Sequence, residues 1–262
     1  MSAAAQRNPG MTDAEWQTRC TLAMLYRVVD HLGWTDLINT HMSARIPGEP
    51  AHFLINNYGE LFDEVTASSL VKMDLDGQVL DSSVLDGSAL DGRGKFNAAG
   101  FTIHSGVYKG RPDANCVMHT HTRAGAALSV MDNGLRPISQ DALQVLSEVA
   151  YHPYGPPATQ QECDELARNC QNGSCLVLLN HGLLTLAPTV HGAFFRMWNL
   201  ERAAELEVMA RTMGVVPVMI DPAVVQTFAK YLSRRVNTHE FGLLEFQAIV
   251  RKLERNGVDC HR

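Results

Sequence analysis

The stretch "GFTIHSGVYKGRPDANCVMHTHT", residues 100–122, joins a helix pattern to a buried-strand pattern and carries two closely spaced histidines. The pattern predicts a helix over about 98–109, ended by "GRPD", and then a strand. Side chains two residues apart leave a strand on the same face, so His119 and His121 point the same way, with Cα atoms roughly 6–7 Å apart. Two such imidazoles can converge on one metal ion, but the pair alone also fits one core histidine and one surface histidine.

A third histidine, His181, completes a candidate ligand set. It follows the apolar strand "CLVLL" and precedes Gly182, where a chain leaving a sheet tends to expose side chains at a pocket. Three imidazoles bound to one ion leave coordination positions open for chemistry. The sequence therefore predicts that His119, His121 and His181 bind a divalent metal ion. Imidazole suits Zn, Mn, Co and Fe, so the sequence does not choose among them.

The rest of the chain alternates short strands with helices. Capping boxes at Thr12 and Thr159 begin two helices, and further helices are predicted over about 190–213, from 222 and over about 239–255. Several strand pairs, including one over 70–74 and 78–80, are too closely spaced for helical crossovers. This spacing favours one mixed or antiparallel sheet with helices packed on it. We expect a disordered leader over 1–10 and a single domain over 11–262, of which 215–262 forms a helical C-terminal extension.

Composition argues against several classes of protein. The formal net charge is −6, and no run of Lys or Arg indicates a nucleic-acid surface. No apolar stretch reaches the roughly 18 residues of a membrane span, and the N-terminus lacks the apolar core of a signal peptide. We therefore expect a cytoplasmic protein with neither nucleic-acid nor membrane partners. The six cysteines lack CxxC spacing, which predicts free thiols and indicates neither a disulfide framework nor a Cys-based zinc site.

The quoted stretch, together with "LLNHGLLT" (178–185) and "WNLERAAELE" (198–207), resembles the class II aldolase/adducin superfamily. The resemblance runs from about Glu15 to Met213. It implies an α/β fold, a three-layer α/β/α arrangement with a central, mainly antiparallel sheet. It also implies a homotetramer with active sites at subunit interfaces, and a divalent metal held by the residues matching His119, His121 and His181.

The chain departs from the sugar-phosphate enzymes of this superfamily at three places. Those enzymes carry an acid four positions before a histidine, where this chain has Gly100 before His104. Two serines that help to hold phosphate align with Ala98 and Ala99, and a Gly-Asn pair aligns with Thr40-His41. These departures imply a non-phosphorylated substrate. They resemble the adducin-like bacterial branch, which lacks the usual catalytic acid.

The missing acid favours decarboxylation over aldol cleavage. Retro-aldol cleavage requires a base for a hydroxyl proton, whereas decarboxylation requires an electron sink and one proton donor. We therefore expect a divalent-metal-dependent carbon–carbon lyase acting on a small hydroxy- or keto-carboxylate, such as a hydroxylated aromatic acid. A non-haem iron oxygenase with a three-histidine site and a non-catalytic adducin-like scaffold are the alternatives. Replacing Gly100 with Glu is expected to add a fourth metal ligand.

Two further residues, His41 and Arg45, are the catalytic candidates. In "INTHMSAR" they share one strand face with Ser43. His41 is predicted to donate a proton or to contact the substrate carboxylate, or else to bond local backbone. Arg45 is expected to pair with a substrate carboxylate or with a structural acid. His152 is placed either near the metal or on the surface, and His104 is expected to support the site rather than to bind metal.

Overall fold

The fold of the computed structural model is built on one seven-stranded sheet with the strand order β3-β2-β1-β4-β7-β6-β5. The structure describes residues 7, 10–80, 96–236 and 238–261, so most of the predicted leader lies outside the described residues. The strands are β1 (His41–Ile46), β2 (Glu49–Ile55), β3 (Val71–Asp74), β4 (Cys116–Thr120), β5 (Val149–His152), β6 (Cys175–Leu178) and β7 (Gly182–Ala187). Neighbouring strands are antiparallel except for the parallel pair β5 and β6, which confirms the predicted mainly antiparallel sheet.

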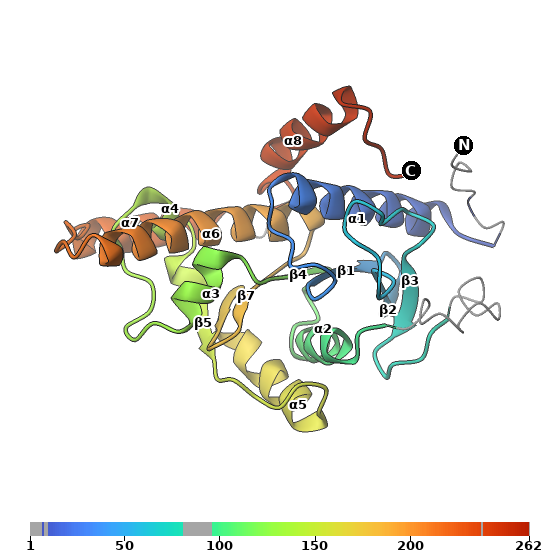
Figure 1. Cartoon of the computed structure of the whole chain (residues 1–262), viewed down its shortest axis with the longest axis horizontal. Helices are drawn as coiled ribbons and strands as arrows, with labels where there is room; N and C mark the ends of the chain where they lie inside the picture. The colour runs from blue at the N-terminus through green and yellow to red at the C-terminus, as the bar shows by residue number, and fades with distance from the viewer. Residues whose placement is uncertain (1–6, 8–9, 81–95, 237, 262) are drawn as a thin grey trace.

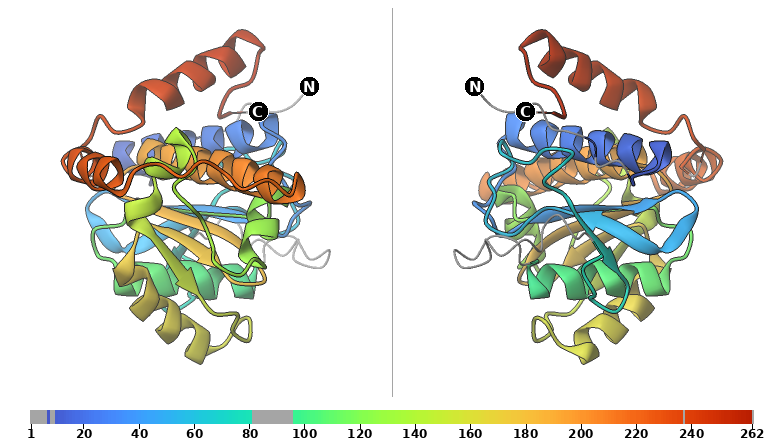
Figure 2. Two further views of the ribbon diagram at one scale, coloured as in Figure 1. Left: turned by 90° about the vertical axis from the view of Figure 1, so that its left-hand side faces the viewer. Right: turned by 90° about the vertical axis from the view of Figure 1, so that its right-hand side faces the viewer.

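Helices cover both faces of this sheet. They are α1 (Asp13–His31), α2 (Ala98–Gly110), α3 (Arg123–Ser129), α4 (Gln140–Leu143), α5 (Gln160–Asn169), α6 (Val190–Thr212), α7 (Pro222–Leu232) and α8 (Leu243–Arg255). The long helices α1 and α6 lie on one face together with α3, and α2 and α5 lie on the other (Figures 1 and 2). Helix α8 packs outside α1 and α6. The predicted three-layer α/β/α arrangement is confirmed.

The central strands are buried because both of their faces are covered by helices. Strands β1, β4, β6 and β7 are buried along their whole length. Met42 and Met118 belong to the core beneath α1 and α6, whereas Val117 and Leu184 belong to the core beneath α2. The side-chain alternation of β1 and β4 therefore turns His41 and His119 toward the α2 side.

Helix ends follow the predicted caps, with one correction. The Thr12 and Thr159 hydroxyls accept hydrogen bonds from the amides of Glu15 and Glu162, as capping boxes require. Helix α8 begins at Leu243 and not near 239, because Gly242 has a left-handed backbone (φ 76°) that interrupts the helix. The extended segment predicted over 78–80 pairs with β3 as the predicted hairpin requires, but only through one antiparallel bridge between Val79 and Met73, with the Leu80 amide donating to the Lys72 carbonyl oxygen at 2.9 Å.

Helices α2 and α5 pack closely together, because α2 presents glycines to α5. A Cβ atom added at Gly110 would lie 2.1 Å from the Ala167 carbonyl oxygen, and one added at Gly106 would lie 2.7 Å from that of Cys163. Close packing fixes α2 against the sheet, and with it the residues of its first turns. Those residues border the site described below.

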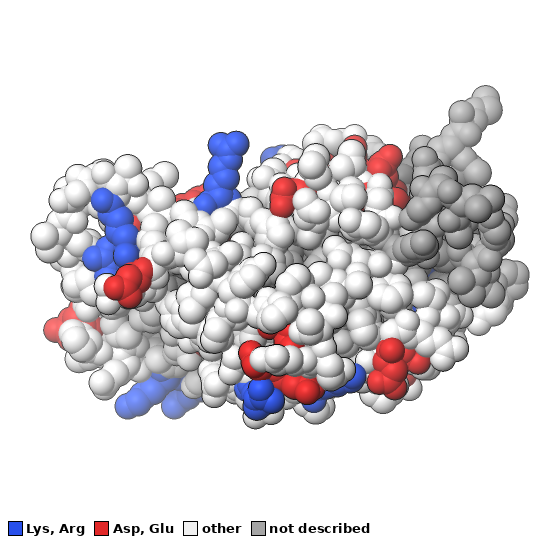
Figure 3. Space-filling view, turned by 60° about the horizontal axis from the view of Figure 1, so that its bottom comes forward, with Lys and Arg blue, Asp and Glu red and all other residues white. Residues whose placement is uncertain are grey.

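The molecular surface carries charges of both signs. On the face that carries α2 and α5, Lys and Arg side chains are scattered among Asp and Glu and form no continuous basic area (Figure 3). Within the described part of the chain, no helix combines the length and apolar character that a membrane span requires.

Candidate metal centre

Strand pairing brings His119, His121 and His181 together at one end of the sheet. His119 lies on β4, His121 directly follows β4, and His181 lies in the turn between β6 and β7, the strand that pairs with β4. The ligand atoms of the three imidazoles all lie within 4.8 Å of one another. Donors bound to one ion at about 2.1 Å are separated by roughly 3–4 Å, so these three could hold a metal ion after a small movement.

The turn that carries His181 approaches β4 through Gly182. A Cβ atom at Gly182 would lie 2.4 Å from the Thr120 carbonyl oxygen and 3.0 Å from Cδ2 of His121. The preceding Asn180 has a left-handed backbone (φ 60°), and its amide donates to the Ser129 carbonyl at 3.0 Å. The sequence "NHG" therefore shapes a tight turn that holds the His181 ring beside the other two.

Hydrogen bonds fix the tautomers of two of the histidines. Nδ1 of His119 lies 2.9 Å from the Leu183 carbonyl oxygen, and Nδ1 of His121 lies 2.8 Å from Oδ2 of Asp36. Both partners only accept hydrogen bonds, so both Nδ1 atoms carry the proton and both Nε2 atoms present lone pairs. These two Nε2 atoms are 2.9 Å apart. Two lone pairs at that distance repel, and a cation between them would remove the repulsion.

Burial lowers the pKa of two of these imidazoles, those of His119 and His181, and so keeps them neutral. Loss of hydration lowers the pKa of His119 well below its ordinary value, and nearby histidines lower it further. Burial, with the neighbouring His121 and His152, lowers the pKa of His181 to about 4. Neutral imidazoles are the form that binds metal, so the environment of these residues fits a cation.

His41 lies beside this cluster, at the start of a buried polar chain. It pairs with His119 in the register of β1 and β4, and the two ring centroids are 5.0 Å apart. Nδ1 of His41 is 2.7 Å from Nε2 of His104. The other nitrogen of His104 is hydrogen-bonded to the Ser43 hydroxyl, which in turn lies 2.7 Å from the Tyr108 hydroxyl. Nδ1 of His41 is thus engaged, and its Nε2 remains for the pocket that His41 lines.

The His41 ring lies directly against Gly100, the position at which the acid is missing. A Cβ atom added at Gly100 would lie 2.6 Å from Cδ2 and 2.8 Å from Nε2 of His41. The His41 ring therefore occupies the space into which a side chain at position 100 would project.

The histidines line a pocket of about 270 Å³. Two acids near it, Asp36 and Glu162, were missed by sequence reasoning. Glu162 occupies the last position of the capping box that begins at Thr159, and Asp36 lies in the "GWTDLINT" segment, which contains no motif of its own. The pairing of Asp36 with His121 and of Glu162 with His152 depends on tertiary contacts.

His152 is not a surface residue, which corrects one of the two expected placements. It ends β5, is 2% exposed and lines the same pocket. Its Nδ1 accepts a hydrogen bond from the Asn169 amide at 2.9 Å, and its Nε2 donates to Oε1 of Glu162 at 2.9 Å. Oε2 of Glu162 is buried and has no hydrogen-bond partner in the described part of the chain. The His152–Glu162 pair therefore places at the pocket a carboxylate whose Oε2 atom can still accept a hydrogen bond.

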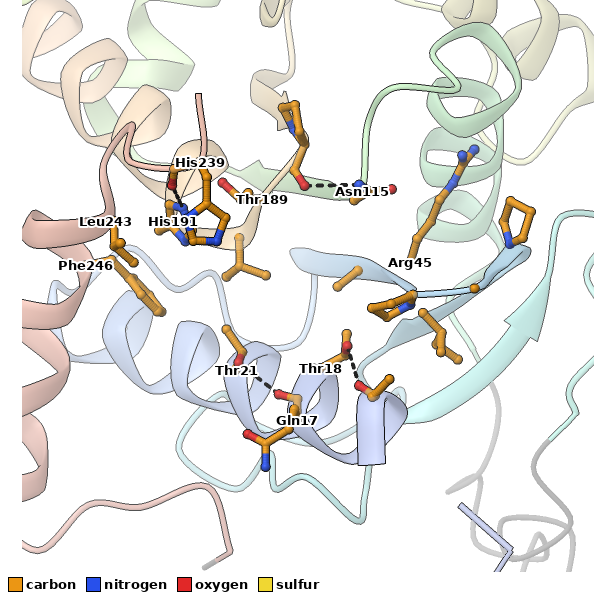
Figure 4. Close-up of a pocket in the computed structure, with 18 of the residues that line it drawn as sticks. Gln17, Thr18, Thr21, Arg45, Asn115, Thr189, His191, His239, Leu243 and Phe246 are labelled. Atoms are coloured by element: carbon orange, nitrogen blue, oxygen red, sulfur yellow. Dashed lines mark hydrogen bonds between the residues drawn. The ribbon is translucent and has the colours of Figure 1, made fainter. Parts of the chain in front are cut away.

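Arg45 points away from this pocket. Its guanidinium donates to the carbonyl oxygens of Tyr108 at 2.6 Å and Pro112 at 3.1 Å, and it lies 4.6 Å from the Tyr108 ring centroid. Arg45 lines a separate cavity of about 750 Å³ between α1 and the start of α8 (Figure 4). Its contacts favour the structural role, with backbone carbonyls in place of the expected acid.

Comparison with known proteins assigns the chain to a family. The model of the "Class II Aldolase and Adducin N-terminal domain" matches residues 20–208. A candidate aldolase class 2 protein from Pseudomonas aeruginosa is 42% identical over 92% of this chain and 91% of its own length. Alpha-adducin from Rattus norvegicus is 41% identical over 91% of this chain but only 33% of its own length.

A solved structure supports the same assignment. An aldolase II superfamily protein from Pseudomonas syringae superposes with a TM-score of 0.87 and 37% identity, covering 96% of this chain and 98% of that one. The family match over residues 20–208 includes the strands and the turn that carry the three histidines. The chain belongs to the class II aldolase and adducin family.

Proposed function

We propose that this chain is a divalent-metal-dependent carbon–carbon lyase acting on a non-phosphorylated hydroxy- or keto-carboxylate, with decarboxylation favoured over aldol cleavage. The observation that carries the proposal is the convergence of His119, His121 and His181, with two Nε2 lone pairs 2.9 Å apart in a pocket. Zn, Mn, Co and Fe all fit imidazole ligands. Such an ion, when bound, would stabilise negative charge on the substrate oxygens.

The pocket favours a small anion without phosphate. Among its lining residues that the structure describes, none is Lys or Arg. The residues aligned with the family's phosphate contacts are Ala98, Ala99 and Thr40-His41, and the alanine side chains offer no hydrogen bond. A phosphate dianion would therefore find no Lys or Arg among the described lining residues, whereas a carboxylate beside a hydroxyl or keto group could chelate a divalent ion. A volume of about 270 Å³ suits such a compact acid.

His41 is the proposed proton donor. In decarboxylation the bond to the carboxylate carbon breaks, its electron pair stays on the substrate carbon, and that carbon then takes a proton. Burial lowers the pKa of His41, so its imidazole is neutral and can give a proton from Nε2 only if Nδ1 gains one. The hydrogen bond of 2.7 Å to His104 offers that exchange. His104 in turn bonds the Ser43 hydroxyl, which continues the chain toward Tyr108.

Two alternatives are retained, each with its own observation. An iron oxygenase with a three-histidine site would use the same ligands, because three imidazoles on one face of Fe(II) leave positions for substrate and O₂. A non-catalytic scaffold is compatible with the 41% identity to the matched third of alpha-adducin. The buried polar chain from His41 to Tyr108 favours catalysis, since a scaffold needs no such chain in a pocket.

Assembly as a homotetramer with active sites at subunit interfaces is part of the proposal. The segment between α6 and α7 exposes Val216 (95%) and Val218 (90%), and Met213 at the end of α6 is also exposed. Contiguous exposed apolar side chains of this kind are typical of subunit contacts. We also propose a cytoplasmic location, which agrees with the free state of the six thiols.

The proposal is tested by metal analysis followed by substrate screening. Purified protein should carry about one divalent ion at the histidine centre, and the loaded protein should release CO₂ from a member of a panel of hydroxybenzoates and keto acids. Oxygen uptake with the same panel would identify the oxygenase instead. A protein that binds no metal at this centre would support the scaffold, and efficient turnover of sugar phosphates would overturn the proposed substrate class.

A further inference from the structure

We infer that Cys20, Cys260 and His261 form a second cation site, suited to a thiophilic ion such as Zn²⁺ or Cu⁺, which joins the segment after α8 to helix α1. The sequence indicated no Cys-based metal site, because the two cysteines are far apart in the chain and lack CxxC spacing. Folding places them together. This inference is independent of the proposed lyase function.

The three side chains offer a soft set of donors at short range. One ligand atom from each, two thiol sulfurs and one imidazole nitrogen, lies within 4.8 Å of the other two. Sγ of Cys260 is 3.5 Å from Nε2 of His261. Tetrahedral Zn²⁺, with sulfur at about 2.3 Å and nitrogen at about 2.1 Å, holds its donors roughly 3.6–3.8 Å apart. The distance between Cys260 and His261 is close to this value, and the other two pairs would reach it after a movement of roughly 1 Å at most. Both cysteines are partly exposed and His261 is exposed, so an ion can reach the site.

Contacts outside the donor set hold the C-terminal residues in place. The Cys260 carbonyl oxygen accepts a hydrogen bond of 2.8 Å from the Ala67 amide. The amide of His261 donates to Oδ1 of Asp259 at 2.7 Å. The His261 ring stacks on Trp16 of α1, with centroids 5.7 Å apart and planes inclined by 24°. Trp16 lies one helical turn before Cys20, so the ring is held over the helix face that carries the thiol.

The other four cysteines are not surrounded by further metal-binding side chains within the described ranges. Cys116, Cys163, Cys170 and Cys175 are buried, and none of them belongs to a group of three metal-binding side chains within the described ranges. Thiolates select Zn²⁺ and Cu⁺ over harder cations, and three protein ligands leave one position for water. An ion here would link Cys20 on α1 to Cys260 and His261, which follow α8, and would thereby stabilise the packing of α8 on the domain.

Cobalt binding tests the site without interference from the histidine centre. A thiolate bound to Co²⁺ gives an intense charge-transfer absorption in the near ultraviolet, which an all-histidine site cannot produce. We expect the reduced full-length protein to develop this band and to saturate at one equivalent of thiolate-bound Co²⁺. Cys20→Ser and Cys260→Ser should abolish the band, and His261→Ala should weaken the apparent affinity by about tenfold or more. Cys163→Ser, which removes a thiol outside the site, should leave it unchanged.

A second measurement does not depend on the folding of a variant. Cd²⁺ added to the wild-type protein should protect Cys20 and Cys260 from alkylation, as read by mass spectrometry of peptides. No charge-transfer band, a band that survives Cys20→Ser, or equal alkylation with and without Cd²⁺ would overturn the proposal. So would a Cys20–Cys260 disulfide that forms readily while the reduced pair binds no metal.

Discussion

The imidazole of His41 fills the space that a side chain at position 100 would need, with a Cβ at Gly100 only 2.6 Å from Cδ2 of His41. Two of the three positions at which the sequence departs from the sugar-phosphate pattern therefore meet in space: position 100 carries no side chain, and a histidine from β1 lies where one would project. The hydrogen bond to His104 holds that ring, so it cannot turn aside without losing a buried contact. This pairing explains how a site without the acid retains an ionisable group.

Substitutions at Gly100 and His41 should have strongly non-additive effects on the free energy of unfolding. Gly100→Glu alone forces the acid against the His41 ring, and overpacking of this kind costs about 1–3 kcal/mol of unfolding free energy. Adding His41→Asn to Gly100→Glu should recover most of that loss and bind metal more tightly than the wild type. The expectation that Glu at position 100 simply adds a ligand thus applies to the double variant. Urea unfolding of the wild type, both single variants and the double variant gives a double-mutant cycle. Additive changes in unfolding free energy would show that the two positions do not interact.

Alanine at any one of His119, His121 and His181 should lower metal affinity by tenfold or more. Asp36→Asn should weaken binding by about 10- to 100-fold, because the carboxylate that orients His121 loses its charge. His191→Ala is the matched control, since His191 is also buried but bonds the His239 carbonyl oxygen in the separate cavity. Metal content after dialysis against limiting chelator measures each effect. Full metal content in all three alanine variants would exclude the centre.

Glu201 should make the protein less stable as pH rises. Burial raises the pKa of its carboxyl to about 7 from an ordinary 4.5, so the folded state holds a proton that the unfolded state releases between these values. The loss is complete above pH 7 and amounts to about 3 kcal/mol at most. Glu201→Gln removes the titration, so its stability relative to wild type should be higher at pH 8 than at pH 5 by urea unfolding. The same difference at both pH values would refute this account.

Gly110→Ala should separate helices α2 and α5. The added methyl group would meet the Ala167 carbonyl oxygen at 2.1 Å, a backbone atom that cannot rotate away. We expect a loss of about 1–3 kcal/mol in unfolding free energy. Lys109→Ala, one residue earlier, removes only a partly exposed ion pair of 3.5 Å with Asp76 and should change stability by less than about 1 kcal/mol. Equal effects of the two substitutions on the unfolding free energy would show that the close packing of α2 on α5 contributes little to stability.

Polar replacement of Val216 and Val218 should disrupt the proposed assembly. Both side chains are nearly fully exposed, so Val216→Ser/Val218→Ser leaves the folded subunit intact while it removes apolar contact area. Light scattering after size-exclusion chromatography should report a smaller species than the wild type. An unchanged mass would place the subunit contacts elsewhere, and a monomeric wild type would contradict the tetramer itself.

Local sequence predicted the elements of the fold well where periodicity and caps agree. Thr12 and Thr159 cap the helices that they were expected to cap, and β4 carries His119, with His121 directly after its end. The start of α8 was predicted too early, because the left-handed conformation of Gly242 depends on its packing against Phe195 as well as on its own sequence. A strand at Val79 was also predicted, but its pairing reaches no further than one bridge.

The sequence by itself determined the family, the mainly antiparallel sheet and the residue types that could bind a metal. Those features follow from spacing along one chain: a period of two on a strand, a cap at a helix start, a glycine after a histidine. The tertiary structure decided how those residues meet. The Asp36–His121 bond, the replacement of a residue-100 side chain by His41 and the meeting of Cys20 with His261 all join segments distant in sequence. Strand register and helix packing set those distances, and no local pattern encodes them.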